Sequence, residues 1–156
     1  MRLYHGSTVE IDSIDLGLSR PNKDFGRAFY LSADYEQALA MAQFKAEFEN
    51  VDPIVTAFDF DEANLARLRY LSFDGYTAEW AHFVYENRTE PHGMAAHDYD
   101  IVYGPIANDR IGAQIARYRQ GYISFDDFIN RIRYMKGITF QYAFCTQKAI
   151  EGLVKA

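Results

Sequence analysis

Short apolar runs bounded by glycine, proline or polar residues recur along the chain and predict β-strands. Runs rich in β-branched and aromatic residues favour strands because such side chains pack well on a pleated, half-buried surface. The clearest run is Ile54 to Phe60. The predicted strands are Arg2 to His5, Ala28 to Ser32, Ile54 to Phe60, Tyr99 to Tyr103, which Gly104-Pro105 stops, and Ile138 to Cys145.

Apolar residues spaced three and four apart predict helices between these strands. The predicted helices run from Ala33-Asp34 to Asp52-Pro53, over Thr77 to Asn87, from Asn108-Asp109 to Gly121, from Ser124 to Gly137, and over Thr146 to Val154. Ser124 and Asp127 have the spacing of a capping box, so we expect a helix to start there. Two stretches stay open: Val9 to Leu18 is a strand or a loop, and Leu65 to Leu71 a short strand or a helical turn.

The order of these elements indicates an α+β fold. The strands are separated too irregularly for a repeated parallel βαβ unit. With 156 residues, 49% of them hydrophobic, the chain is long enough for one domain with a substantial core. We therefore expect residues 1–156 to form a single domain.

Charge and cysteine content narrow the classes of function. The net charge of −6 disfavours broad binding to nucleic-acid phosphates, which needs a basic surface. Cys145 is the only cysteine, which excludes an internal disulfide and a cysteine-based zinc site, and it is expected in the core. The chain has no basic-then-apolar leader and no apolar run approaching ~18 residues. These features predict a cytoplasmic protein that does not enter a membrane.

Histidines are the remaining candidates for metal binding. The sequence has four, at His5, His82, His92 and His97, and only the last two share a loop. Together with Asp98 or Asp100 they could hold a metal, but a solvated loop with two histidines is common. We therefore predict no metal site.

Two segments near the N-terminus, together with one near the C-terminus, resemble a known family. Leu3-Tyr4-His5-Gly6-Ser7 and Phe25-Gly26-Arg27-Ala28-Phe29-Tyr30-Leu31-Ser32 are similar to the first two signatures of ADP-ribosyltransferases of the His-Tyr-Glu type. These enzymes are related to the poly(ADP-ribose) polymerases and to diphtheria toxin. Ala28 stands where a second glycine is usual. Gln141-Tyr142-Ala143-Phe144 fits the third signature, with Gln for Glu.

The chain as a whole, from Leu3 to about Leu153, resembles a bacterial family of toxin-like ADP-ribosyltransferase domains. Residues 19–26 and 98–110 are typical of it. The resemblance implies two small antiparallel sheets forming a split sandwich, with an NAD cleft between them and helices around. It also implies an antitoxin protein as a partner.

The resemblance further implies a set of site residues, with NAD as co-substrate. His5 would hydrogen-bond a ribose hydroxyl of NAD, and Gly6, supported by Ser7, would present its backbone to the nicotinamide amide. Tyr30 would stack on the nicotinamide ring. From charge and position alone we expect residues 19–24, a cationic loop that contains Arg20 and Lys23, to lie over the pyrophosphate. The expected catalytic residues are His5, Tyr30 and Gln141, and the expected NAD-binding residues are His5, Gly6, Ser7, Arg20, Asn22, Lys23, Phe25, Gly26 and Tyr30.

Gln141 is the informative departure, because an amide accepts a hydrogen bond but carries no charge and is no base. We therefore expect transfer of a single ADP-ribose to a macromolecule. The acidic net charge favours a protein over a nucleic acid as that acceptor. Asp100 or Asp109 could supply a carboxylate from another loop, although turn and helix-cap roles favour a structural reading of both. Two rival hypotheses remain: a degenerate module that binds NAD or ADP-ribose without chemistry, and an interaction protein with an aromatic surface.

Overall fold

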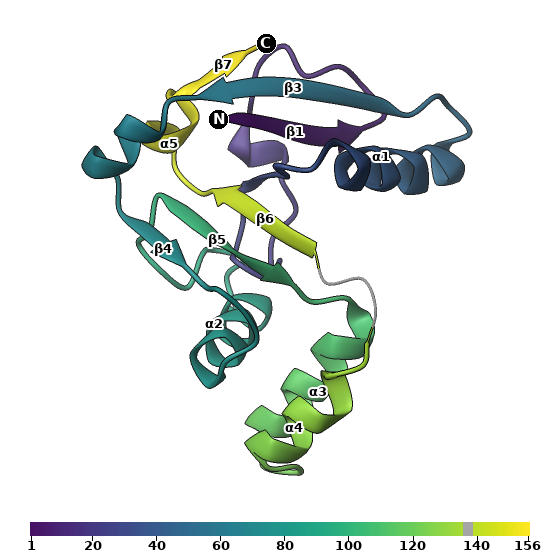
Figure 1. Cartoon of the computed structure of the whole chain (residues 1–156), viewed down its shortest axis with the longest axis vertical. Coiled ribbons are helices and arrows are strands. Elements are labelled where there is room, and N and C mark those ends of the chain that lie inside the picture. The colour runs from purple at the N-terminus through teal and green to yellow at the C-terminus, as the bar shows by residue number, and fades with distance from the viewer. Residues whose placement is uncertain (136–138) are drawn as a thin grey trace.

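Two small β-sheets frame the computed structural model, which describes residues 1–135 and 139–156 (Figure 1). The first sheet has the strand order β1-β3-β7 and the second β2-β6-β5-β4. The strands are β1 (Arg2–Ser7), β2 (Phe29–Leu31), β3 (Ile54–Phe60), β4 (Tyr70–Ser72), β5 (Ile101–Ile106), β6 (Thr139–Phe144) and β7 (Leu153–Lys155). The helices are α1 (Tyr35–Glu49), α2 (Ala78–Arg88), α3 (Asp109–Arg119), α4 (Phe125–Ile132) and α5 (Gln147–Ile150), with 3-10 turns at Leu16–Leu18 and Glu62–Arg67.

Apolar side chains fill the space between the two sheets. Leu3, Phe58 and Phe60 of the first sheet pack in one cluster with Phe29, Leu31, Ile101 and Phe144 of the second. A second cluster lies on the other face of the four-stranded sheet, where Trp80, Val84, Ile111, Ile115, Phe128 and Ile132 of α2, α3 and α4 cover it. The three-stranded sheet, the four-stranded sheet and the helices α2 to α4 therefore follow one another from top to bottom of Figure 1, while α1 packs against β1 and β3.

The sheets meet where β1 passes the end of β2. Tyr4 and Ser32 exchange two backbone hydrogen bonds of 2.8 Å, which form a single bridge between the strands. Beyond this bridge β1 pairs with β3 and β2 pairs with β6. The bridge therefore sets the N-terminal strand beside Tyr30 at the point where the sheets diverge.

Most predicted elements are confirmed, with moved ends. Each of the four longer helices begins at a side-chain cap, supplied by Asp34, Thr77, Asn108 and Ser124, and Ser124 with Asp127 forms the predicted capping box. Val9 to Leu18 contains no strand, and the stretch from Leu65 to Leu71 holds the end of a 3-10 turn and the start of β4. The fourth helix ends at Ile132; its predicted stop, Gly137, and the predicted strand start, Ile138, lie outside the described residues.

The prediction that Gly104-Pro105 stops a strand was wrong. β5 continues through both residues, with Pro105 opposite Phe140. β4 pairs with β5 only as far as Tyr103, so the missing N–H of Pro105 removes no ladder bond. Strand pairing with β6 outweighs the local tendency of Gly-Pro to end a strand.

The predicted helix from Thr146 to Val154 was also too long. α5 ends at Ile150, and residues Leu153–Lys155 form β7 beside β3. A Cβ at Gly152 would lie 2.9 Å from the Phe60 ring, so the chain turns closely over that strand. A short apolar run in a sequence is compatible with a helix or a strand. Here the run becomes a strand because it pairs with the free edge of β3.

The α+β class with two small sheets is confirmed, but the sheets are not wholly antiparallel. β4 and β5 run parallel, with Tyr70 opposite Ile101. α2 lies between these strands in the chain, so β4, α2 and β5 form one parallel crossover unit. The described residues contain no helix long and apolar enough to cross a membrane.

Candidate functional site

One cavity of about 480 Å³ collects residues from distant parts of the sequence. The residues that line it come from the loop before β2, from the strands β2, β5 and β6, and from α1, α2 and the start of α3. It is lined by Asn22, Lys23, Asp24, Tyr30, Met41, Arg88, Ile106, Ala107, Asp109 and Gln141. Four of the predicted site residues, Asn22, Lys23, Tyr30 and Gln141, thus share one cavity.

Tyr30 is held rigidly at this wall. Its hydroxyl donates to Gly26 O at 2.7 Å and accepts from Phe25 N at 3.0 Å. The residue is only 8% exposed, and burial raises its pKa well above the ordinary value, so the phenol stays protonated. The Lys23 ammonium lies 4.5 Å from the centre of the Tyr30 ring, within cation–π range. The ring therefore already attracts a cation.

His5 lies beside Tyr30 rather than in the cavity wall. Its Nδ1 is 2.8 Å from Tyr30 O, and because a carbonyl only accepts, Nδ1 carries the proton. Burial lowers the pKa of His5 to about 4, and the charges of Lys45 and Lys23 act in the same direction. The imidazole is therefore neutral near pH 7, with Nε2 left as an acceptor.

Gly6 has a packing role that the sequence did not indicate. A Cβ at this position would lie 2.0 Å from Ala38 O, inside the backbone of α1. Ala38, Ala42 and Ala46 are buried on the face of α1 that allows this close approach. The Gly6 carbonyl accepts a 2.9 Å hydrogen bond from Lys45 Nζ, so the main-chain acceptor expected to meet nicotinamide already has a partner.

The other predicted NAD-binding residues lie outside the cavity wall. Ser7 Oγ accepts from Val9 N at 3.3 Å in the turn after β1, and Arg20 is exposed. Phe25 is fully buried, and Gly26 has a φ of +87°, a left-handed conformation that favours glycine. These last two residues shape the turn that holds the Tyr30 hydroxyl.

Asn22 lines the cavity but is also a structural anchor. Its φ is +58°, and its Nδ2 donates to Glu90 O at 2.8 Å and to Asn87 O at 3.3 Å. Both acceptors lie at or just beyond the end of α2. Asn22 therefore fixes the cationic loop against α2.

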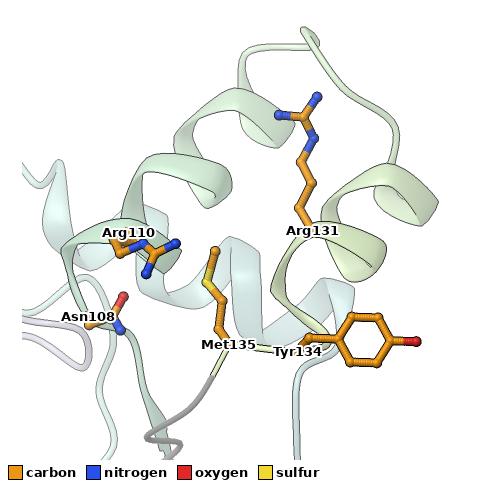
Figure 2. A pocket seen from close by; sticks show the side chains of 5 residues that line it. All are labelled: Asn108, Arg110, Arg131, Tyr134 and Met135. Carbon is orange, nitrogen blue, oxygen red and sulfur yellow. The ribbon is translucent and has the colours of Figure 1, made fainter.

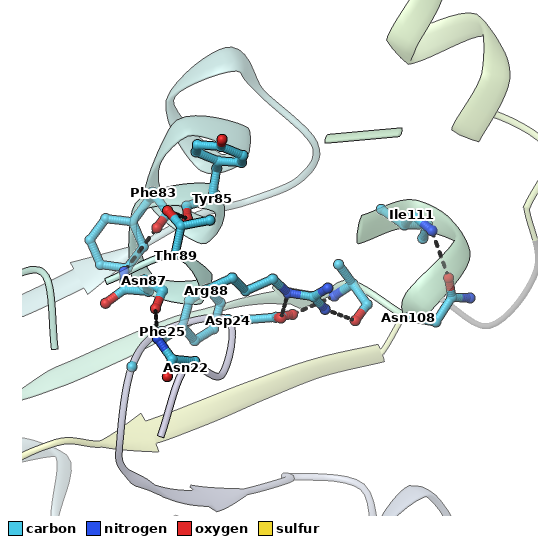
Figure 3. Close-up of polar contacts among 12 residues, drawn as sticks. Asn22, Asp24, Phe25, Phe83, Tyr85, Asn87, Arg88, Thr89, Asn108 and Ile111 are labelled. Atoms are coloured by element: carbon cyan, nitrogen blue, oxygen red, sulfur yellow. Dashed lines mark hydrogen bonds and ion pairs between the residues drawn. The ribbon is translucent and has the colours of Figure 1, made fainter. Parts of the chain in front are cut away.

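Sequence reasoning missed an ion pair in the cavity wall between the buried carboxylate of Asp24 and the partly buried guanidinium of Arg88. Arg88 Nε lies 2.7 Å from Asp24 Oδ1, and Arg88 Nη2 donates to Ala107 O at 2.8 Å (Figure 3). Asp24 Oδ2 accepts from Ala107 N at 2.6 Å. Desolvation raises the pKa of Asp24, against the opposing charge of Arg88. The partners are 64 positions apart, so no local pattern signals the pair.

His97 and Cys145 form a further polar contact near Phe25, in the segment that precedes β2. His97 Nε2 is 2.7 Å from Phe25 O, His97 Nδ1 accepts from Tyr99 N, and Cys145 Sγ is 3.9 Å from His97 Nε2. Burial raises the pKa of Cys145 to about 12, so it is not a thiolate nucleophile. Within the described residues no group of three His, Cys, Asp or Glu side chains could hold a metal ion.

A second hollow of about 460 Å³ lies at α3 and α4 and contains none of the predicted site residues. It is lined by Asn108, Arg110, Arg131, Tyr134 and Met135 (Figure 2). The Met135 side chain stands between the two arginines, and Tyr134 points outward, 83% exposed. Arg131 donates from Nη1 to Gln114 Oε1 at 3.4 Å.

Comparison with known proteins identifies the family of the chain. No curated protein matches the sequence. A family model with the description "Protein of unknown function (DUF3990)" matches residues 1–154. Since this match spans nearly the whole sequence, the chain belongs to the DUF3990 family.

Proposed function

We propose that the protein is an NAD-dependent mono-ADP-ribosyltransferase with an ADP-ribosyltransferase fold. The observation that carries the proposal is the meeting of Lys23, Tyr30 and Gln141 in one cavity of about 480 Å³. These residues come from the segments that resemble the second and third signatures and from the cationic loop between the first two. A cavity of this size with a few convergent polar groups is typical of a small-molecule site.

The recognition roles of His5 and Tyr30 each have a geometric basis. The unprotonated Nε2 of His5 can accept a hydrogen bond from a ribose hydroxyl, because Nδ1 is committed to Tyr30 O. The Tyr30 ring attracts cations, and the nicotinamide ring of NAD carries a positive charge. The same attraction that holds Lys23 now would therefore hold the nicotinamide ring.

Binding of NAD requires two lysines to move. Lys23 occupies the Tyr30 ring, and Lys45 occupies the Gly6 carbonyl that nicotinamide would use. Both are flexible point charges that can turn toward the pyrophosphate. Burial and the charges of Lys23 and Arg20 lower the pKa of Lys45, so the three cations already lie close to one another. The displaced cations thus become phosphate ligands in this proposal.

Transfer then goes to a macromolecular acceptor, and the resemblance implies a toxin that a partner protein neutralises.

The second candidate function is a module that binds NAD or ADP-ribose without chemistry. Gln141 favours it, because a neutral amide gives less support than a carboxylate to the positive charge that develops on the ribose.

The test uses purified protein, labelled NAD and a bacterial lysate, with nicotinamide release and label transfer as readouts. His5→Ala is the site variant, and His92→Ala, an exposed histidine outside the cavity, is the matched control. NAD-induced rise in melting temperature is measured for all three proteins, because a ligand of the native state stabilises it by mass action.

We expect wild type and His92→Ala to label a discrete macromolecule, and His5→Ala to fail. A melting shift with NAD but no nicotinamide release would replace the transferase by the binding module. No response to NAD in any assay would reject both functions and favour the interaction protein.

A further inference from the structure

The cavity wall contains two carboxylates, and only one of them is available for chemistry. Asp24 is 4% exposed, and its two oxygens are taken by Arg88 Nε and Ala107 N. Asp109 is exposed at the opening residue of α3. Within residues 1–135 and 139–156 its carboxylate forms no hydrogen bond or ion pair.

The local structure does not need Asp109 as a cap. Asn108 is the N-cap of α3, and its Oδ1 accepts from Ile111 N at 2.8 Å (Figure 3). The remaining structural role is the general preference for an acid in the first helical turn. Asp126 has that same role in α4 but lies outside the cavity wall.

Gln141 reaches the cavity from β6, and Asp109 reaches it from the start of α3, which follows the neighbouring strand β5. Gln141 lies on β6 opposite Gly104 of β5, and the chain leaves β5 after Ile106 to reach Asp109. The other sequence candidate, Asp100, lies outside the cavity, with its oxygens bound to Thr146 Oγ1 at 2.6 Å and Arg69 N at 2.8 Å.

We infer that Asp109 supplies the carboxylate that Gln141 lacks, and that it accepts the proton of the acceptor nucleophile. This inference rests on the proposed transferase function. The bond between ribose C1′ and the nicotinamide nitrogen breaks, and its electron pair leaves with nicotinamide, which becomes neutral. The acceptor oxygen or nitrogen forms the new bond to C1′ while its proton passes to Asp109 and then to water.

This division of labour specifies the acceptor chemistry. A carboxylate acceptor carries no proton near pH 7 and needs no base, whereas a hydroxyl or amide acceptor does. Gln141 then only positions the ribose by accepting a hydrogen bond, and Asp109 offsets the developing positive charge. The acceptor is therefore a hydroxyl or nitrogen group rather than an Asp or Glu side chain.

The test compares Asp109→Asn, its control Asp126→Asn, and the double variant Asp109→Asn/Gln141→Glu. Label transfer, nicotinamide release and the NAD-induced melting shift are measured for each. We expect Asp109→Asn to lower the transfer rate roughly 100-fold, the usual size of a lost general base, while keeping the melting shift. Asp126→Asn should match wild type, and the double variant should regain part of the lost rate, which a purely structural role of Asp109 does not allow.

Each other outcome overturns the inference in a distinct way. Wild-type transfer by Asp109→Asn, with His5→Ala inactive, rejects the role of Asp109 and leaves the transferase standing. Loss of the melting shift in Asp109→Asn assigns the residue to binding or folding instead. If wild type binds NAD without releasing nicotinamide, or does not bind NAD, the transferase fails and the inference fails with it.

Discussion

The Nδ1 of His5 lies 2.8 Å from the main-chain oxygen of Tyr30, so the first candidate residue is fixed by the backbone of the second. This contact follows from the bridge between Tyr4 and Ser32, which brings β1 against the end of β2. A single pair of backbone hydrogen bonds thus sets the orientation of the imidazole. The tautomer of His5 depends on this contact, whereas burial lowers the pKa of His5 and the hydrogen bond to Tyr30 O partly opposes that shift.

Stability should fall as the pH drops from about 6.5 to about 4. The pKa of His5 is about 4 in the folded protein and 6.5 ordinarily, so between these pH values the unfolded chain binds a proton that the folded protein does not. This proton binding lowers the free energy of the unfolded state relative to the native state. At ~1.4 kcal/mol per pKa unit, His5 contributes up to about 3 kcal/mol to the change. Urea unfolding of wild type and His5→Gln at several pH values measures it. An equally steep fall in His5→Gln would show that other groups carry the effect.

Gly6→Ala should destabilise the fold by roughly 1–3 kcal/mol or more, because its methyl group would overlap the backbone at Ala38. Gly75→Ala is the control, since a Cβ there meets nothing within 4 Å. Thermal or urea unfolding compares the two. A Gly6→Ala protein as stable as Gly75→Ala would mean that α1 shifts without cost.

Arg88→Met should cost about 3–5 kcal/mol, because it leaves the buried carboxylate of Asp24 without its partner. The control is Arg2→Met, which removes an ion pair with Asp59 in which both side chains are 53% exposed. That change should cost far less, because water screens an exposed ion pair and solvates both groups when the pair is lost. Equal effects in denaturant unfolding would contradict the difference in burial.

Tyr30→Phe separates the hydroxyl from the ring. The variant leaves Phe25 N and Gly26 O without their buried partner, so the free energy of unfolding should fall by about 1–3 kcal/mol. Tyr122→Phe, at a residue 77% exposed, should leave stability unchanged. The NAD-induced melting shift should persist in Tyr30→Phe, since the ring remains. Loss of the shift would assign recognition to the hydroxyl.

Elements with a strong local signal were predictable from sequence. Ile54 to Phe60 is a strand because its residues suit a pleated surface, and the capped helices begin at their capping residues. β7 was not predictable, because Leu153–Lys155 becomes a strand only by pairing with β3. The parallel pairing of β4 with β5 likewise depends on the path of α2 across the sheet.

The candidate site likewise contains residues with a local sequence signal and residues whose role depends on distant parts of the chain. Tyr30, Lys23 and Gln141 share a cavity. The family resemblance leads us to expect Tyr30 and Gln141 in one site, and charge and position lead us to add Lys23. Arg88 and Lys45 escaped notice because each acts on a partner far away in the chain, Asp24 and Gly6 respectively. The partner of such a cation, a carboxylate for Arg88 and a main-chain carbonyl for Lys45, is known only once the fold brings the two together.

Pro105 also makes the end of β5 a poor site for pairing with a strand of a second copy of the chain. Backbone groups alternate in direction along a strand, so Tyr103 and Pro105 both face the side of β4, which pairs with β5 only up to Tyr103. At Pro105 this side offers no N–H, and its carbonyl already accepts a 2.8 Å hydrogen bond from Trp80 Nε1. Because Pro105 is buried and has no N–H, an incoming strand finds no exposed donor or acceptor at this position, which disfavours edge-to-edge pairing through the end of β5.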